Sequence, residues 1–226
     1  TLAVVGIGDD GSARYSFHTA ATSARFVEDQ GPLPERTTAV ALGTLGMVLE
    51  PGASVYEAVL RREAERGRFI ALDPNIRADL IEDPDAYRKR FASWLPSVSL
   101  LKLSVDDARW LAPGEDPLDA LRRWQAAGPS GVVLTRGSDG LTALSGSGQV
   151  IEVDSVPSTV FDTIGAGDTV QAALLAWLYW HDALDVSALH RLEAPQWERA
   201  LRFAASAAAI TVSRPGAEPP YSSEME

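Results

Sequence analysis

Short apolar runs recur through the middle of the chain without the regular alternation of a half-exposed strand. They span residues 39–45, 69–73, 98–103 and 131–136. A strand that is covered on both faces has no polar face, so continuous apolar runs are typical of the inner strands of a parallel sheet. The pattern predicts four such strands.

Segments with helical spacing of apolar positions separate these runs and predict helices over residues 54–67, 83–95, 104–111 and 116–128. In the first segment, Ser54 and Glu57 have the spacing of a capping box, and Gly67 suits a C-terminal stop. Strands that alternate with helices predict βαβ units with right-handed crossovers. The predicted fold class is therefore α/β, a doubly wound, mostly parallel sheet with helices on both faces.

The start of the chain has a different pattern. Residues 2–7 and 13–19 predict two strands around the turn Asp10-Gly11, and the polar residues 20–37 predict a connection. The chain opens directly in a strand-like run without an initiator Met. We therefore expect part of the natural N-terminus to be missing.

The last third of the chain changes pattern again. Residues 140–144 and 149–156 predict antiparallel strands at one edge of the sheet. Helices are predicted over residues 166–183 and 195–212. Residues 220–226 predict a frayed or loosely packed tail.

Composition and charge narrow the class of protein. The chain has 226 residues, of which 46% are apolar, enough for one sizeable α/β domain. The net charge of -11 argues against a nucleic-acid partner, because phosphate binding requires clustered Lys and Arg. The chain has no cysteine, which excludes disulfides and thiolate chemistry. No apolar run reaches bilayer length and no signal peptide opens the sequence, so we expect a cytoplasmic protein without a membrane partner.

The segment FDTIGAGDTV, residues 161–170, places two acids and two glycines in a turn before an apolar helix. Glycine lets a ligand approach the main chain, and free N–H groups at a helix N-terminus favour an anion. Asp168 would repel that anion, unless its carboxylate takes a proton from a hydroxyl that attacks a bound phosphoryl group. The segment predicts either an anion hole with a base or only helix capping, since Asp and Gly are common at helix starts.

The same segment resembles the C-terminal signature of the ribokinase-like (PfkB) family of carbohydrate kinases, Asp-Thr-x-Gly-Ala-Gly-Asp. Further segments are similar to motifs of that family and occur in its order: LDPNIR at 72–77, KLSVDDARWL at 102–111, LTRGSDG at 134–140 and AASAAAITVSRPGAEPP at 204–220. Five ordered motifs are far more specific than one. The likeness begins near residue 39 and is nearest to the fructokinase and 2-keto-3-deoxygluconate kinase branch.

The resemblance implies a role for each matching residue. Asp168 matches the catalytic base, and Gly165, Ala166 and Gly167 match the anion hole around the transferred phosphoryl group. The positions that match contacts to ATP are Asn75, Arg77, Lys102, Ser104, Thr135, Gly137, Gly140 and Ala208. The implied cofactors are ATP and Mg2+, with a monovalent cation as a further option.

Three of these positions also have a structural interpretation. Asp107 falls at the family's magnesium-linked motif, but Ser104 and Asp107 equally have the spacing of an N-cap and its N3 partner. Mg2+ would bridge the phosphates through oxygen ligands and water, so no His or Cys cluster is expected. Lys102 either reaches a phosphate or emerges at the end of its strand, and Asn75 either contacts the nucleotide or only shapes the turn.

The resemblance also divides the chain into β-lid strands at residues 1–22 and an α/β kinase domain at residues 38–226 that is incomplete at its N-terminus. In relatives the lid closes over the sugar and mediates dimer contacts, which implies a homodimer. Tyr15, in the lid, joins Asp168 and Arg77 as a candidate for contact with the sugar. The alternative for Tyr15 is a place in the core.

The first hypothesis is therefore an ATP-dependent sugar kinase that transfers the γ-phosphoryl group to a hydroxyl of a small sugar, with fructose favoured. The alternatives are 2-keto-3-deoxygluconate kinase, ribokinase and nucleoside kinase. A catalytically inactive relative that binds sugar or nucleotide is the alternative from a different class. A Rossmann dehydrogenase is rejected, because its Gly-rich loop should follow the first strand.

Overall fold

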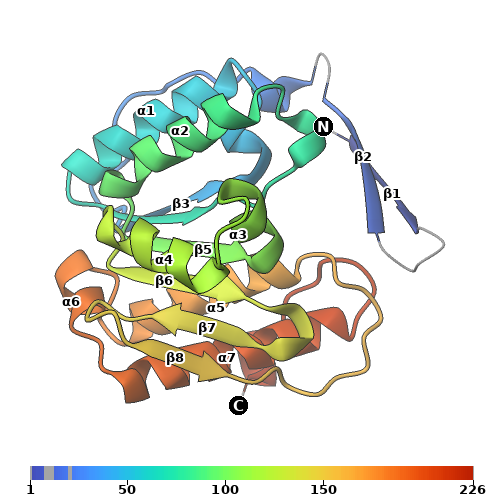
Figure 1. The fold of residues 1–226 in the computed structure, drawn as a ribbon, viewed down its shortest axis with the longest axis vertical. Coiled ribbons are helices and arrows are strands. Elements are labelled where there is room, and N and C mark those ends of the chain that lie inside the picture. The colour runs from blue at the N-terminus through green and yellow to red at the C-terminus, as the bar shows by residue number, and fades with distance from the viewer. Residues whose placement is uncertain (1, 8–12, 20–21, 226) are drawn as a thin grey trace.

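The computed structural model describes residues 2–7, 13–19 and 22–225, and its centre is a six-stranded sheet (Figure 1). Neighbouring strands of the sheet follow one another in chain order. The parallel strands are β3 (Ala39–Gly43), β4 (Phe69–Asp73), β5 (Leu100–Ser104) and β6 (Gly131–Thr135), and the antiparallel edge strands are β7 (Leu141–Leu144) and β8 (Val150–Val153). The predicted mostly parallel sheet with an antiparallel edge is confirmed.

Helices cover both faces of this sheet, as predicted (Figure 1). One face carries α1 (Gly52–Glu65), α2 (Pro84–Trp94), α3 (Val105–Leu111) and α4 (Pro117–Ala126). The other face carries α5 (Ala166–Trp180), α6 (Val186–His190) and α7 (Ala194–Val212). Short 3-10 helices lie at Ser23–Arg25, Thr44–Met47, Ala78–Leu80, Leu95–Ser97, Gly137–Asp139 and Ser222–Glu224. Within the described ranges, none of the helices has the length and apolar character needed to cross a membrane.

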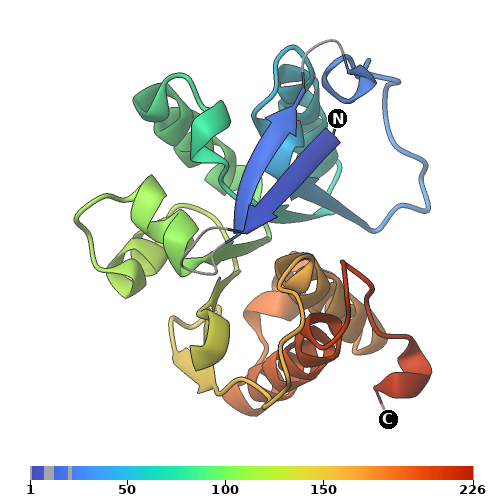
Figure 2. The same ribbon diagram turned by 90° about the vertical axis from the view of Figure 1, so that its right-hand side faces the viewer.

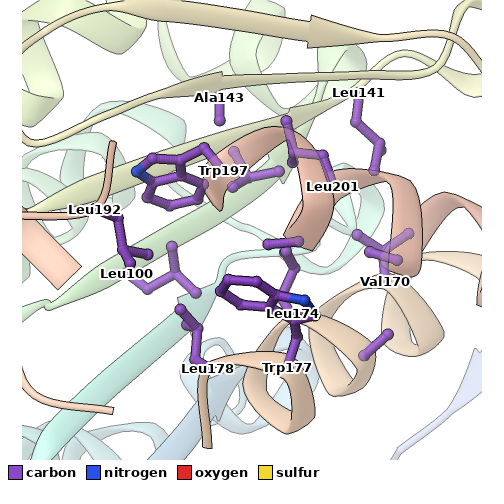
Figure 3. Close-up of a cluster of buried hydrophobic side chains, with 14 of the residues drawn as sticks. Leu100, Leu141, Ala143, Val170, Leu174, Trp177, Leu178, Leu192, Trp197 and Leu201 are labelled. Atoms are coloured by element: carbon purple, nitrogen blue, oxygen red, sulfur yellow. The ribbon is translucent and has the colours of Figure 1, made fainter. Parts of the chain in front are cut away.

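Alternate residues of the inner strands supply two separate cores. In β4, Phe69 packs with α5 and α7, whereas the next residue, Ile70, packs under α1 to α4. Figure 3 shows the first core, in which Trp177 of α5 and Trp197 of α7 lie near Leu100 of the sheet. Burial on both faces explains why these strands lack polar alternation.

The capping box predicted at Ser54 and Glu57 is wrong. α1 begins at Gly52, and the Ser54 N–H and hydroxyl both donate to the Glu50 carboxylate at 3.1 Å. The free N–H of Ser54 at this helix start is therefore satisfied by a carboxylate that precedes the helix, not by one within it. Gly67 follows α1 with φ of 76°, so the predicted stop is confirmed.

Two further differences lie near the C-terminus. The sequence did not predict α6, because its five residues are too few to show a period. The tail is more firmly attached than its composition predicts: Arg214 pairs with Glu224, and Met225 packs against the core formed by α5, α7 and the sheet. One charge pair and one apolar side chain fix a segment that has few apolar residues.

A separate two-stranded sheet is formed by β1 (Leu2–Ile7) and β2 (Ala13–His18), with Leu2 opposite His18. The turn predicted at Asp10-Gly11 lies outside the described residues. Figure 1 shows this hairpin apart from the main sheet, on the side where the parallel strands end, and in Figure 2 that side faces the viewer. The strand pair is confirmed, and its role as a lid stays a prediction.

Candidate active site

The Gly-rich turn leads into the N-terminus of α5. Gly165 is the N-cap, with φ of 76° and ψ of -2°, a left-handed conformation that favours glycine. No side chain caps the helix, and within the described residues the N–H groups of Gly167 and Asp168 donate to no protein acceptor. Unpaired N–H groups at a helix N-terminus attract negative charge. The turn is therefore suited to an anion.

Asp162 ties this turn to the segment that follows α7. Its carboxylate accepts hydrogen bonds from the N–H groups of Ile164 (2.8 Å) and Gly216 (3.1 Å). A Cβ on Gly165 would lie 2.7 Å from the Cβ of Ala217, so the two segments pack closely there. The anion-binding turn is thus supported from the C-terminal side of the chain, a role of Asp162 that the sequence analysis missed.

A cavity of about 500 Å³ lies between α5, α7 and the loop after β6, and we call it the α7 cavity. The wall formed by α7 has small side chains at helical spacing: Ala205, Ala208, Ala209 and Val212. Thr135, Gly137 and Gly140 line the same cavity, as do Ala166 and Gly167 of α5. The structure thus brings together four of the positions matched to ATP, from two separate motifs: Thr135, Gly137, Gly140 and Ala208.

A second cavity, of about 300 Å³, lies along another face of α5, and we call it the β3 cavity. Its α5 wall is formed by residues at helical spacing: Asp168, Gln171, Ala172 and Leu175. The other wall is formed by residues 41–44, at the end of β3, and by Asp73, the last residue of β4. Ligands of α/β proteins commonly bind at the carboxyl ends of the strands.

The first turn of α5 belongs to both cavities. Ala166 and Gly167 line the α7 cavity, whereas Asp168 lines the β3 cavity. A phosphate of a ligand in the first cavity and a hydroxyl of a ligand in the second can therefore approach the same turn. The exposed carboxylate of Asp168 is accessible to such a hydroxyl.

A buried ion pair lies beside this turn. Lys102 Nζ is 2.6 Å from Asp73 Oδ2, and the two residues are 4% and 5% exposed. A Cβ on Gly167 would lie 2.9 Å from Lys102 Nζ, so the ammonium group lies against the first turn of α5. Burial raises the pKa of the Asp73 carboxyl; Lys102 opposes this shift, and Asp107 and Asp168 add to it. The pair places a positive charge next to the anion-binding turn.

Asn75 and Arg77 lie in the loop after β4. Asn75 has φ of 41°, unusual for a residue with a side chain, and its amide donates to Thr44 Oγ1 at 3.3 Å. Arg77 Nη1 donates to Asn75 Oδ1 at 2.6 Å, and its guanidinium carbon lies 6.0 Å from the ring centre of Phe17 in β2. This loop therefore contacts both Thr44, after the end of β3, and Phe17 of the hairpin. Neither Asn75 nor Arg77 belongs to the two cavities as the described residues form them, so their contacts to ATP or sugar stay predictions.

Ser104 and Asp107 form the capping box at the start of α3. Ser104 Oγ accepts from the Asp107 N–H at 3.0 Å, and Asp107 Oδ2 accepts from the Ser104 N–H at 2.9 Å. Asp107 Oδ1 accepts from the Ile76 N–H at 2.7 Å, so both carboxylate oxygens have partners. The capping interpretation is confirmed. The part of the chain that the structure describes contains no cluster of three or more His, Asp or Glu that could hold a metal, and the metal-linked role of Asp107 stays a prediction.

Sequence reasoning missed Thr44, Asp73 and Gln171 of the β3 cavity. Two of them had a signal in the sequence, because Gln171 lies three residues after Asp168 on one helix face and Asp73 ends a buried strand. Tyr15 lies in β2, opposite Val5, but its side chain is outside the part of the structure that is described. Its contact with a sugar therefore stays a prediction.

Comparisons with known proteins find relatives of this chain. The chain is 32% identical over 195 residues to a fructokinase from Rhizobium leguminosarum bv. trifolii, across 85% of this chain and 58% of that protein. It is 29% identical over 189 residues to a fructokinase from Klebsiella pneumoniae, across 80% of this chain and 60% of that protein. The chain therefore spans less than two thirds of the length of these relatives.

Solved structures share the fold. The crystal structure of a fructokinase from Vibrio cholerae O395 with fructose, ADP and calcium ion bound matches with a TM-score of 0.77 at 18% identity, over 95% of this chain and 68% of that one. An aminoimidazole riboside kinase from Salmonella enterica matches with a TM-score of 0.75 at 20% identity, over 94% and 69%. At these identities the likeness shows the fold alone.

A match to a family model assigns the chain to a family. The model of the pfkB family carbohydrate kinases matches residues 8–224, nearly the whole chain. That range includes both cavities and the turn between them. The chain belongs to the pfkB family of carbohydrate kinases.

Proposed function

We propose that this protein is an ATP-dependent sugar kinase that phosphorylates a hydroxyl of fructose. One observation carries the proposal: the first turn of α5 borders two cavities, with Ala166 and Gly167 facing one and Asp168 facing the other. ATP would occupy the α7 cavity, where small side chains and glycine loops leave room for a flat base. The sugar would occupy the β3 cavity. The fructokinase relatives support the choice of fructose over ribose, a nucleoside or 2-keto-3-deoxygluconate.

The chemistry follows from the position of the turn. Asp168 accepts the proton of the sugar hydroxyl as its oxygen forms a bond to the γ-phosphorus. The bond from the γ-phosphorus to the bridging oxygen breaks, and that oxygen leaves with ADP. The N–H groups of Gly167 and Asp168, and the Lys102 ammonium, stabilise the charge on the transferred group. The protein mainly positions the reactants, since phosphoryl transfer has a loose transition state.

Magnesium fits this site as part of Mg-ATP. Both oxygens of Asp107 accept protein hydrogen bonds, so a contact of this residue with the ion would use the remaining lone pairs of its carboxylate. Phosphate oxygens and water would supply most of the ligands, as is common for Mg2+ in kinases. The ion would neutralise charge on the phosphates. A requirement for a monovalent cation is part of the same proposal and is tested by replacing K+ with Tris in the assay.

The homodimer implied by the hairpin also belongs to the proposal. β1 and β2 pair only with each other among the described strands, and the hairpin lies apart from the main sheet (Figure 1). A two-stranded ribbon of this kind is marginally stable alone and gains from contact with another surface. Sedimentation of the full-length protein with and without the hairpin tests this arrangement.

The decisive experiment measures ADP release by the full-length protein with Mg-ATP and a panel of sugars, beside Asp168→Ala. General base catalysis contributes about 100- to 10,000-fold, so the variant should lose that factor in kcat while it still binds ATP. Asp119→Ala is the matched control, because Asp119 occupies the equivalent position in the first turn of α4 and is exposed. Its activity should equal that of the wild type.

Two results would contradict the proposal. If no sugar stimulates ADP release although sugar and ATP both bind, the protein is a binding relative without catalysis. If Asp168→Ala keeps its activity, as Asp119→Ala does, then Asp168 acts only at the start of the helix.

A further inference from the structure

The wall of the β3 cavity contains two buried oxygens without hydrogen-bond partners. Asp73 Oδ1 and Gln171 Oε1 find no partner within the described residues, and the two residues are 5% and 8% exposed. Most buried polar groups in proteins are paired, so an unpaired one requires an explanation. Two of them in one cavity wall indicate a place where a ligand supplies the partners.

The positions of these residues relate them to the proposed base. Gln171 is three residues after Asp168, on the face of α5 that lines the cavity. Asp73 faces the same cavity from the end of β4, and its other oxygen is held by Lys102. Neither free oxygen is in contact with solvent. The terminal torsions of Asp and Gln side chains are broad, so a small rotation turns either polar group toward the cavity.

The charge of the β3 cavity limits the chemical class of ligand that it can bind. Its lining, as the described residues form it, contains the carboxylates of Asp73 and Asp168 but no Lys, Arg or His. Lys102 is paired with Asp73 and is not part of the lining. A carboxylate on the ligand would meet the charge of Asp168, whereas the charges of Asp73 and Lys102 offset each other, and no unpaired cation among the lining residues would compensate it, which disfavours binding in a confined site. Hydroxyl groups can donate to the free oxygens and carry no charge.

We propose that Gln171 and Asp73 are specificity-determining residues that accept hydrogen bonds from substrate hydroxyls and make the β3 cavity selective for a neutral polyhydroxyl compound over a sugar acid. This inference rests on the proposed function, since it assigns the β3 cavity to the sugar. It predicts that fructose is bound in preference to 2-keto-3-deoxygluconate. Gln171 positions a hydroxyl next to Asp168, and Asp73 holds a second hydroxyl against the end of β4.

Calorimetric titration of the full-length protein without ATP tests the inference independently of phosphoryl transfer. The wild type should bind fructose at least about tenfold more tightly than 2-keto-3-deoxygluconate. Gln171→Leu should weaken fructose binding about five- to tenfold, the effect of one lost hydrogen bond. Gln125→Leu is the matched control, because Gln125 is a partly buried amide that lines neither cavity and donates to the Ser145 carbonyl. Its affinity for fructose should be unchanged.

A second variant is designed to bind the sugar acid more tightly. Gln171→Lys adds a cation to the β3 cavity, so its preference should shift by about tenfold toward 2-keto-3-deoxygluconate. Equal binding of both compounds by the wild type would overturn the inference, as would undiminished fructose binding by a folded Gln171→Leu. Failure of fructose to bind at millimolar concentration would also overturn it. Loss of ADP release with intact and selective fructose binding would instead contradict only the proposed kinase function.

Discussion

The two cavities beside α5 use one helix in opposite ways. The α7 cavity meets α5 through Ala166, Gly167 and Val170, and its walls consist largely of small and apolar side chains. The β3 cavity meets α5 through Asp168, Gln171, Ala172 and Leu175, and includes the carboxylates of Asp73 and Asp168. An apolar pocket with a few polar groups suits a flat aromatic ligand, whereas the second lining suits a ligand rich in hydroxyls. In the proposed function, one helix face would therefore receive the donor and the next face the acceptor of the phosphoryl group.

After Asp168→Ala, the largest effect is expected at Gly167, which lines the α7 cavity and directly precedes Asp168 of the β3 cavity. A Cβ there would lie 2.9 Å from Lys102 Nζ, and Lys102 is buried and paired with Asp73, so it has little freedom to move away. Gly167→Val should lower kcat by about 100-fold, the size expected when reactive groups are displaced by about 1 Å. Steady-state kinetics with saturating ATP and fructose measures this. Ala176→Val, on the same helix but outside both cavities, is the control and should keep its kcat.

Larger side chains at two positions test directly whether the two cavities bind different substrates. Ala208 lines the α7 cavity and Ala172 lines the β3 cavity. Ala208→Leu should raise the KM for ATP by about tenfold and leave that for fructose unchanged, because the added methylenes occupy only one cavity. Ala172→Leu should have the reverse effect. If both variants raise the same KM, the assignment of the two cavities to different substrates is wrong.

A moderate effect is expected at Asp107, which supports the loop after β4 without lining either cavity. Asp107→Ala removes the hydrogen bonds to the N–H groups of Ser104 and Ile76, and should lower the free energy of unfolding by about 1–2 kcal/mol. Ser104→Ala removes the cap and the hydrogen bond from Ser104 Oγ to Asp107 Oδ2, keeps the bond from the Ile76 N–H, and should cost about 1 kcal/mol. Urea unfolding measures both values. A large rise in the Mg2+ concentration needed for half-maximal activity of Asp107→Ala, but not of Ser104→Ala, would show that Asp107 acts on the metal as well as on the fold.

The α7 cavity was far easier to predict from the sequence than the β3 cavity. Its contacts lie in loops whose glycines have positive φ, such as Gly137 and Gly140, and such loops leave contiguous motifs in the chain. The β3 cavity takes single residues from a helix face and from the ends of two strands, and Asp73 and Thr44 meet there only because β3 and β4 pair in register. Sheet register is a tertiary property that a local pattern does not contain.

The fold itself was predictable wherever burial dictates the pattern. Strands covered on both faces and long helices produce the apolar runs that were recognised. The start of α1 was misplaced, because Glu50 lies before the helix and satisfies Ser54 in a way that spacing alone does not reveal. Short elements such as α6 fall below the length at which a period is visible.

The smallest effect is expected far from both cavities, in the charged network between α1 and α2. Partial burial would raise the pKa of Glu57, but hydrogen bonds from Arg90 and Arg61 outweigh it and lower the pKa from 4.5 to about 2. The contribution of Glu57 to stability is therefore complete above pH 4.5 and is lost as the pH falls toward 2. Relative to Glu57→Gln, the wild type should be more stable by about 1 kcal/mol at neutral pH, allowing for solvent screening, and this advantage should disappear by about pH 2. Urea unfolding at several pH values measures the difference. The kinetic constants for ATP and fructose should be the same in both proteins at neutral pH. A change in either KM would mean that the charged network between α1 and α2 affects substrate binding in the two cavities. The cavities would then not depend on α5 and its neighbours alone.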